Sequence, residues 1–468
     1  MRLGTMLFLA LAAIAAAVPA WAQEPAVPAP VSSTDAAAVP AATGASGASG
    51  APINQSLPGA LSLPEALRQA LAQNPAIGGS RAEVEAAQAQ SDVIFSGILP
   101  RINLAGDFTR NSDEVTFGSG SDARTILPEN DWSYRLTLSQ PIYAGNRERK
   151  AIRQSRLNVE NARHGVEDLE DQVITDVVAG YLGVIQSQEL IAVEERNVEI
   201  AHRRREQAQI FFEAGETTRV DTLRAEAAIK ESERRLATAR QLREIAAGRL
   251  RLALAVEGPV VVEPPGELFP ALPSEPALLA TAEERRPEVA QAVTDLEIAT
   301  LEVGKQKGAR LPVVTADGAW IRQQSAFPSD DYGQLSLRVN VPVYQSGEVA
   351  GRVAVARGRQ RQAELRLQEV KQAVREEVHQ ALVDLETSES RLRLTQEQLA
   401  ASEAEFQQAA ELYRAQELTS LEAEAAQTSL AEARRAVVAG QLDRDLAELR
   451  VWAAAGMLKQ IVPLEDAP

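Results

Sequence analysis

Four segments of the chain alternate apolar and polar residues with a period of two. In residues 100–110, Ile102, Leu104 and Phe108 fall on even positions, whereas polar residues fall on odd ones. Residues 133–143, 312–322 and 334–344 repeat this alternation. Because successive side chains of a strand point to opposite faces, the pattern predicts four β-strands, each with an apolar and a polar face. On the polar face we expect Arg101, Arg135, Thr137, Arg338 and Asn340.

Two very long helical patterns follow the second and fourth predicted strands. Residues 146–214 and 348–415 contain no proline and are rich in Ala, Glu, Arg and Leu. At 1.5 Å per residue, each would extend about 100 Å, which is typical of coiled-coil-like helices. A break follows each run, with Gly215 as a left-handed cap and Thr217 or Thr218 as the start of a returning helix. The pattern therefore predicts two long helical hairpins.

The predicted elements occur twice because the sequence is internally duplicated. Three landmarks recur in order: Asn74-Pro75 as Arg286-Pro287, Leu99-Pro100 as Leu311-Pro312, and Pro141-Ile142-Tyr143 as Pro342-Val343-Tyr344. The first repeat is predicted over residues 59–257 and the second over 277–458, each with a helix, two strands and a long hairpin. Residues 258–276, rich in Pro and Gly, cross between the repeats, and 459–468 form a C-terminal tail.

The N-terminus has the pattern of a targeting segment. Residues 1–22 have a basic start, a short apolar run and a small-residue cleavage site, which predicts a secretory signal peptide. Residues 23–58 consist largely of Ala, Pro, Gly and Ser and are expected to be a disordered leader. No later segment has about 18 consecutive apolar residues, so the sequence predicts an exported protein without a transmembrane helix.

Composition narrows the functional classes. The chain has 48 Lys and Arg against 65 Asp and Glu, a net charge of −17, which disfavours a nucleic-acid partner. It has no cysteine, which excludes disulfides and a lipidated Cys anchor. The three histidines lack a clustered set of further ligands, and no Walker loop, G-x-S-x-G or dinucleotide motif is present. We therefore expect no enzyme activity, no catalytic residue, no metal site and no cofactor.

Four amphipathic strands with open edges cannot close a barrel alone. In a membrane every backbone polar group must be paired, so closure requires other copies of the chain. Two copies would give eight strands, which fill their own interior, and three would give twelve with a water-filled lumen. We therefore predict a homotrimer; the alternative is a soluble sheet core. The expected membrane-interface aromatics are Trp132, Tyr134, Tyr143, Trp320, Tyr332 and Tyr344.

Three segments resemble the TolC-like outer-membrane efflux proteins: residues 61–75, Gln140-Pro141-Ile142-Tyr143-Ala144-Gly145, and Ala214-Gly215-Glu216-Thr217-Thr218. The resemblance covers about residues 58–458. It implies a mixed α+β membrane protein, a trimeric twelve-stranded barrel continued by a periplasmic α-helical barrel. It also implies an exit duct of a tripartite efflux or type I secretion system in the outer membrane, with a periplasmic adaptor and an inner-membrane pump of the RND or ABC type. The alternative is that the chain is itself a periplasmic adaptor.

The same resemblance suggests site residues at the two hairpin tips. The adaptor-contacting candidates are Gly215, Thr217, Thr218, Asp221, Gln416 and Thr419. Glu422, with Glu424 as a second candidate, would form a ring of acids at the pore constriction that selects cations and acts as a pH-sensitive latch. Gln416 stands where the family has Gly, and Glu422 where it usually has Asp. The alternative for Glu422 is an exposed acid on a solvated helix face.

Overall fold

The computed structural model describes residues 60–118, 120, 124–264, 269–324, 330–415 and 417–461. The predicted signal peptide, the predicted leader, Gln416 and the end of the tail lie outside these residues. The described chain forms two compact units. Unit 1 consists of residues 86–159 and 296–362, and unit 2 consists of the remaining described residues.

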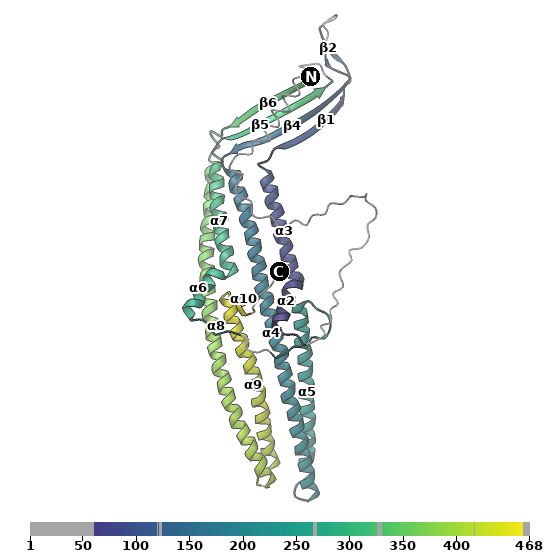
Figure 1. The fold of residues 1–468 in the computed structure, drawn as a ribbon, viewed down its shortest axis with the longest axis vertical. Helices are drawn as coiled ribbons and strands as arrows, with labels where there is room; N and C mark the ends of the chain where they lie inside the picture. The colour runs from purple at the N-terminus through teal and green to yellow at the C-terminus, as the bar shows by residue number, and fades with distance from the viewer. Residues whose placement is uncertain are drawn as a thin grey trace. The chain divides into compact units, whose positions relative to one another are not determined.

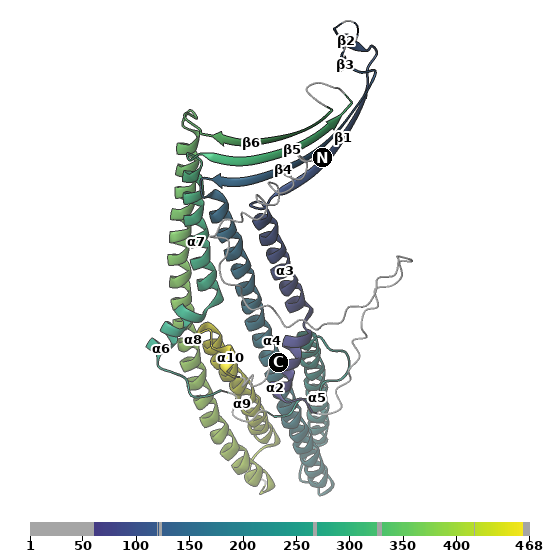
Figure 2. The same cartoon turned by 45° about the horizontal axis from the view of Figure 1, so that its top comes forward.

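Unit 1 contains a four-stranded antiparallel sheet with the strand order β1-β4-β5-β6 (Figure 1 and Figure 2). Its central pair joins the two repeats, because β4 of the first repeat is hydrogen-bonded to β5 of the second. Strands β1 and β6 form the two edges. The strands are β1 (Arg101–Arg110), β4 (Asn130–Ala144), β5 (Val313–Gln323) and β6 (Asp331–Asn340).

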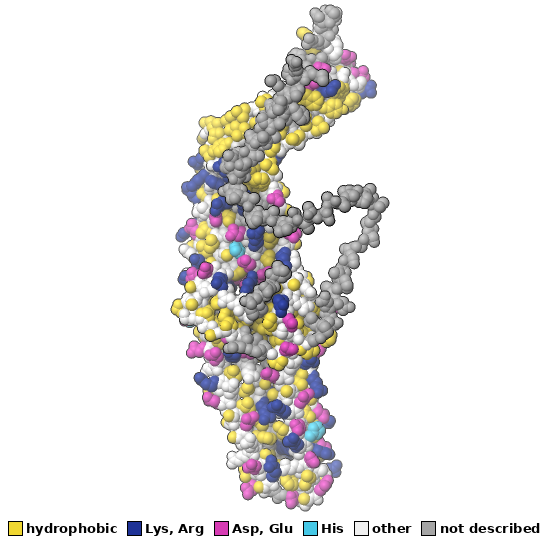
Figure 3. Space-filling model, viewed as in Figure 1, with side chains coloured by type: hydrophobic (Ala, Val, Ile, Leu, Met, Phe, Trp, Pro, Cys, Tyr) yellow, Lys and Arg dark blue, Asp and Glu magenta, His cyan; other side chains and the backbone are white. Residues whose placement is uncertain are grey.

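The strand register gives the sheet one apolar and one polar face. Ile102 lies opposite Leu138, which lies opposite Gly318 and then Leu335, while Arg101 begins a parallel row through Ser139, Asp317 and Ser336. Figure 3 shows hydrophobic side chains gathered over this sheet. Six apolar side chains on that face are between 55% and 71% exposed: Ile102, Leu104, Phe108, Leu335, Leu337 and Val339. Because exposed apolar area of this extent is unfavourable in water, the face requires an apolar partner.

Two details of the sheet differ from the predicted strands. Strand β6 ends at Asn340, whereas the alternation predicted a strand to residue 344. Pro342 explains the difference, because proline has no N–H to donate to a ladder. In β4 the equivalent Pro141 is accommodated by a register shift between Pro141 and Tyr143. The second difference is a hairpin of β2 (Val115–Phe117) and β3 (Arg124–Leu127), which lies between β1 and β4 and was not predicted.

The helices of the two repeats match in length. Both α4 (Arg147–Glu213) and α8 (Glu348–Arg414) contain 67 residues, as the proline-free runs predicted. The returning helices are α5 (Arg219–Leu254) and α9 (Ser420–Ala454), and a short α10 (Leu458–Ile461) follows. The shorter pairs are α2 (Leu63–Gln73) with α6 (Glu275–Arg285), and α3 (Pro75–Ser96) with α7 (Pro287–Gly308). Among the described helices, none combines the length and apolarity needed to cross a bilayer.

In unit 2, both repeats have a hydrogen bond from the junction of two short helices to the C-terminal end of a returning helix. Asn74, between α2 and α3, donates from Nδ2 to the carbonyl oxygen of Ala253 at 3.3 Å. Arg286, between α6 and α7, donates to the carbonyl oxygens of Ala453 and Ala454 at 3.3 Å. Carbonyl groups at a helix C-terminus have no partner within the helix, so each contact satisfies the end of a returning helix.

The core of unit 2 holds the crossing segment in place. Tyr181 of α4 is 1% exposed, and its hydroxyl donates to the carbonyl oxygens of Leu61 and Glu263 at 3.0 and 2.7 Å. Leu61 also forms a parallel bridge with Val262. Around this point the core includes Leu250, Leu254, Leu278 and Trp452. The polar end of one tyrosine therefore fixes two chain segments against an apolar core.

The first repeat has a close backbone approach that the second lacks. Gly145, with φ of 68°, follows β4, and a Cβ at this position would lie 2.3 Å from the carbonyl oxygen of Gly308. Gly347 occupies the equivalent turn with φ of 81°, but a Cβ there would have no atom within 4 Å. The first glycine is therefore required by space and by conformation, and the second by conformation alone.

We predict that Gly145→Ala destabilises the protein more than Gly347→Ala. Both substitutions introduce left-handed strain of about 1–2 kcal/mol, and only Gly145→Ala adds overpacking of about 1–3 kcal/mol. Thermal unfolding in detergent, followed by far-ultraviolet circular dichroism, measures the difference. Equal melting temperatures for the two variants would contradict the prediction.

Candidate functional site

The first hairpin tip is closed by local backbone hydrogen bonds. Helix α4 ends where Gly215 adopts φ of 76°, and the N–H of Glu216 donates to the carbonyl oxygen of Phe211 at 2.9 Å. Thr218 caps α5, and the carboxylate of Asp221 accepts from the Thr218 N–H at 3.3 Å. This reciprocal capping box confirms the predicted glycine cap and identifies Thr218 as the capping threonine.

The second tip repeats this capping box. Thr419 caps α9, and its side chain accepts from the N–H of Glu422 at 3.3 Å. The Glu422 carboxylate accepts in return from the Thr419 N–H at 3.0 Å and from its hydroxyl at 2.7 Å. These bonds lower the pKa of the Glu422 carboxyl. Glu422 therefore has a local structural role that explains its position, in addition to any role in a pore.

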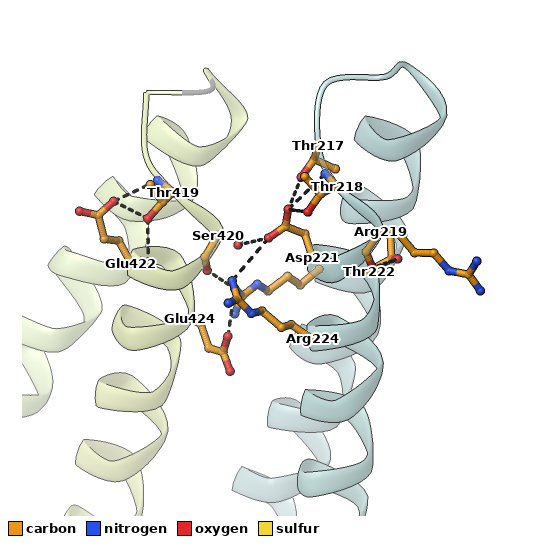
Figure 4. A network of polar contacts seen from close by, with 11 residues as sticks. Thr217, Thr218, Arg219, Asp221, Thr222, Arg224, Thr419, Ser420, Glu422 and Glu424 are labelled. Carbon is orange, nitrogen blue, oxygen red and sulfur yellow. Dashed lines mark hydrogen bonds and ion pairs between the residues drawn. The ribbon is translucent and has the colours of Figure 1, made fainter.

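Asp221 joins the two tips within one chain (Figure 4). Its Oδ1 accepts a 2.5 Å hydrogen bond from the hydroxyl of Ser420, the first residue of α9. Its Oδ2 accepts from the hydroxyls of Thr217 and Thr218 at 2.5 and 3.0 Å. Hydrogen bonds from Ser420, Thr217 and Thr218 lower the pKa of Asp221 to about 2. Asp221 is thus a carboxylate held ionised by donors from both hairpins.

Arg204 of α4 provides a second link between the hairpins. Its guanidinium donates to the backbone carbonyl of Ser420 and, at 3.2 Å, to Oε1 of Gln427. It also lies 3.8 Å from Oε2 of Glu424. The Arg204 side chain is only 13% exposed, and burial lowers its pKa. Arg204 is the middle residue of a basic triplet, 203–205, and it is largely buried because α9 covers it.

The two candidate pore acids have different surroundings. Glu424 lies on the side of α9 that faces Arg204 and is paired with it, whereas Glu422 lies on the opposite side (Figure 4). Glu422 is exposed and its described hydrogen bonds are those of its own capping box. The negative charge of Glu424 is therefore offset within the chain, while that of Glu422 faces outward from this contact.

The register tests the predicted aromatic positions on the sheet. Tyr134 lies opposite Gly106 on the apolar face and contacts Trp132, with ring centroids 5.5 Å apart. Trp320 lies opposite Leu136, and after the register shift Tyr143 lies opposite Val314, on the same face. Tyr332 is an exception: it pairs with Ile321 in the row of Arg135, so it lies on the polar face. Tyr344 follows the end of β6 and is exposed.

A family model described as outer membrane efflux protein matches residues 66–256 and 278–457, which together span most of the chain. The chain belongs to the outer membrane efflux protein family. The two matched ranges coincide with the two structural repeats and leave out the crossing segment between them.

Individual relatives agree with this family assignment. The outer membrane efflux protein BepC of Brucella suis is 24% identical over 419 residues, which cover 86% of this chain and 88% of BepC. The alkaline protease secretion protein AprF of Pseudomonas aeruginosa is 25% identical over 308 residues, 62% of each chain. A solved structure of CusC has a TM-score of 0.74 at 18% identity and covers 84% of this chain and 92% of CusC. The last likeness shows the fold.

Membership of the efflux family decides between the two functional readings of the sequence. The protein is an outer-membrane exit channel with periplasmic helices, and it is not a periplasmic adaptor. The tips described above are therefore those of a family of export channels. Sequence reasoning found Asp221 but missed Ser420 and Arg204, since both look like ordinary helix residues without their partners from the other hairpin.

We predict that Asp221→Asn loosens the tips. The substitution preserves shape but removes the charge that Ser420, Thr217 and Thr218 stabilise, and hydrogen bonds to charged groups contribute about 1.5–3 kcal/mol each. Hydrogen–deuterium exchange of the peptide over residues 417–424 should accelerate at least about tenfold. The matched control is Glu65→Gln, which changes an acid at the same capping-box position in α2 but lies outside the reporter peptide and makes no described contact with it.

The pH dependence of this link follows from the lowered pKa of Asp221. A carboxyl with a folded pKa of about 2, below its usual 3.8, stabilises the folded state above the unfolded pKa and loses this contribution as pH falls towards 2. After correction for intrinsic rates, exchange at the wild-type tip should be the same at pH 7.5 and pH 5. Loosening between these values, or equal exchange in Asp221→Asn and Glu65→Gln, would contradict the assignment.

Proposed function

We propose that three copies of this chain form a twelve-stranded barrel in the outer membrane. The observation that carries the proposal is the four-stranded sheet with an exposed apolar face and open edges at β1 and β6. In lipid each unpaired backbone group costs several kcal/mol, so the edge of one copy must pair with the edge of the next.

The number of strands supports a conducting lumen. Two copies would give eight strands, whose interior is filled by side chains, whereas twelve strands leave room for water. The polar row of Arg101, Ser139, Asp317 and Ser336 would then line the interior. Tyr134 and Tyr143 are nine residues apart in β4, about 30 Å along the strand, or about 23 Å along the membrane normal at a tilt of about 40°. This matches an apolar band of about 25 Å with aromatic residues at both borders.

We further propose that the protein is a passive exit duct and not an enzyme. A periplasmic adaptor would contact the hairpin tips through the candidate residues, which include Gly215, Thr217, Thr218, Asp221 and Thr419. An inner-membrane pump, of the RND or ABC type, would supply the driving force. Relatives named for efflux and for protease secretion, BepC and AprF, support an export role and leave both kinds of cargo open.

The barrel proposal predicts opposite effects at two neighbouring residues of β6. Leu335 lies on the apolar face, in the row of Leu138 midway between Tyr134 and Tyr143, and Ser336 lies on the polar face. A charged residue facing lipid near mid-membrane costs about 2–4 kcal/mol, so Leu335→Arg should sharply reduce heat-modifiable trimer in the outer-membrane fraction. Ser336→Arg should preserve the trimer and shift single-channel selectivity in planar bilayers towards anions. Equal trimer yields for the two variants would overturn the proposed orientation.

For the constriction we propose Glu422, with Glu424 as its internal control. Three copies of an exposed acid around a narrow lumen attract cations, whereas Glu424 is offset by Arg204. Glu422→Gln should lower the cation-to-anion permeability ratio severalfold, and Glu424→Gln should change it less. Unchanged selectivity in Glu422→Gln would leave this residue with its capping role alone.

A further inference from the structure

Unit 1 carries a dense group of basic residues on the helix ends next to the sheet. Residues 145–159, 302–312 and 345–362 contain twelve Lys and Arg against three Glu, a net charge of +9. The fourth helix end, residues 86–96 of α3, carries only Asp92. We call the twelve the basic band: Arg147, Arg149, Lys150, Arg153, Arg156, Lys305, Lys307, Arg310, Arg352, Arg357, Arg359 and Arg361.

The basic band contrasts with the rest of a strongly acidic chain. The whole sequence has a net charge of −17, so the remaining residues sum to −26. Figure 3 shows Lys and Arg side chains gathered where the helices of unit 1 meet the hydrophobic surface of the sheet. Ion pairs account for some of the charge: Arg153 lies 2.6 Å from Glu297, and Lys305 lies 2.5 Å from Glu302. The net charge nevertheless remains strongly positive.

Part of this positive charge lies where the helix dipole disfavours it. Arg147, Arg149 and Lys150 occupy the first turn of α4, where the helix dipole is positive and disfavours cations by about 0.3–1 kcal/mol each. The helix dipole therefore does not explain the presence of these three basic residues. An anion bound at this end would offset both the side-chain charges and the dipole.

The band directly follows the membrane-like part of the sheet. β4 ends at Ala144, three residues before Arg147, and β5 begins at Val313, three residues after Arg310. Exposed apolar and aromatic side chains lie at the strand ends and just beyond them, including Tyr143, Leu311 and Tyr344. The order from apolar through aromatic to basic is that of a membrane–water interface with anionic headgroups.

The two repeats carry the charge at mostly different positions. With the offset of 201 residues, Arg156 corresponds to Arg357, but Arg149 corresponds to Ala350 and Asn158 to Arg359. Both repeats therefore carry a similar positive charge next to the sheet, but most of the basic residues occupy non-equivalent positions. A diffuse charged surface has this property, whereas a site for one small ligand would require fixed geometry.

We propose that the basic band binds anionic phospholipid headgroups of the periplasmic leaflet of the outer membrane. The proposal rests on the barrel orientation proposed above, which brings the helix end of the sheet to that leaflet. Each Lys or Arg near an anionic surface contributes about 1 kcal/mol, and the contribution falls off within about 8–10 Å in physiological salt. Residues beside the strand ends, such as Arg149, Lys307 and Arg310, therefore contribute most. Arg357, Arg359 and Arg361 lie nine to thirteen residues into α8, about 14–20 Å along the helix, and contribute least.

Spin-label electron paramagnetic resonance tests this proposal with the intact protein. The protein is reconstituted in phosphatidylcholine vesicles with trace spin-labelled phosphatidylglycerol or spin-labelled phosphatidylcholine, and the protein-bound fraction of each is compared. We expect wild-type protein to prefer phosphatidylglycerol about threefold or more, and 1 M NaCl, which shortens the screening length to about 3 Å, to remove the preference. The near variant Arg149→Gln, Lys307→Gln, Arg310→Gln should lose most of it.

The distal variant Arg357→Gln, Arg359→Gln, Arg361→Gln removes the same charge about 15 Å further along and should retain most of the preference. A wild-type protein without preference, or equal losses in the near and distal variants, would overturn the proposal. So would an unchanged preference in the near variant with altered ion selectivity of the channel, because the side chains would then line the lumen. If the wild-type protein conducts but shows no lipid preference, only this proposal fails; if it does not insert, the barrel proposal fails as well.

Discussion

Backbone hydrogen bonding at the edges of the sheet is the constraint on which the rest of the structure depends. The pairing of β4 with β5 merges two hairpins from the two repeats into one sheet, but it leaves β1 and β6 with one partner each. The apolar face makes the sheet unsuited to water, and the open edges make it unsuited to lipid as a single copy. In the proposed barrel, association would satisfy both conditions at once, so assembly and membrane insertion would belong to the same physical step.

The sequence predicted the features that depend on periodicity, and these are the larger part of the fold. Alternation located β1, β4, β5 and β6, and the absence of proline located α4 and α8. The sequence pattern did not predict the β2–β3 hairpin, because strands of three and four residues are too short for alternation to be recognised. The sequence analysis also grouped Tyr332 with the interface aromatics by residue type, although Tyr332 has the even parity of Ser336, which the register places on the polar face.

At the hairpin tips, too, the sequence predicted the local features but not the contacts between distant segments. Gly215 and the two capping boxes are local and could be recognised from spacing alone. Ser420 and Arg204 act on residues of the other hairpin, between 199 and 223 positions away in the chain, and their chemistry depends on those distant partners. Two links with different physics result: Asp221 accepts hydrogen bonds near the surface, whereas Arg204 is a largely buried cation that needs its acceptors. Removing the partner of a buried charge costs more than losing an exposed pair.

The equal length of α4 and α8 has a consequence for how this architecture can change over time. Adding one residue to an α-helix turns everything beyond it by about 100° and advances it by about 1.5 Å. Such an insertion in α4 alone would rotate Asp221 away from Ser420 and separate two side chains that are now hydrogen-bonded. The two 67-residue helices are therefore coupled in evolution, and viable changes of length must occur in both repeats together or be absorbed by a local distortion of one helix.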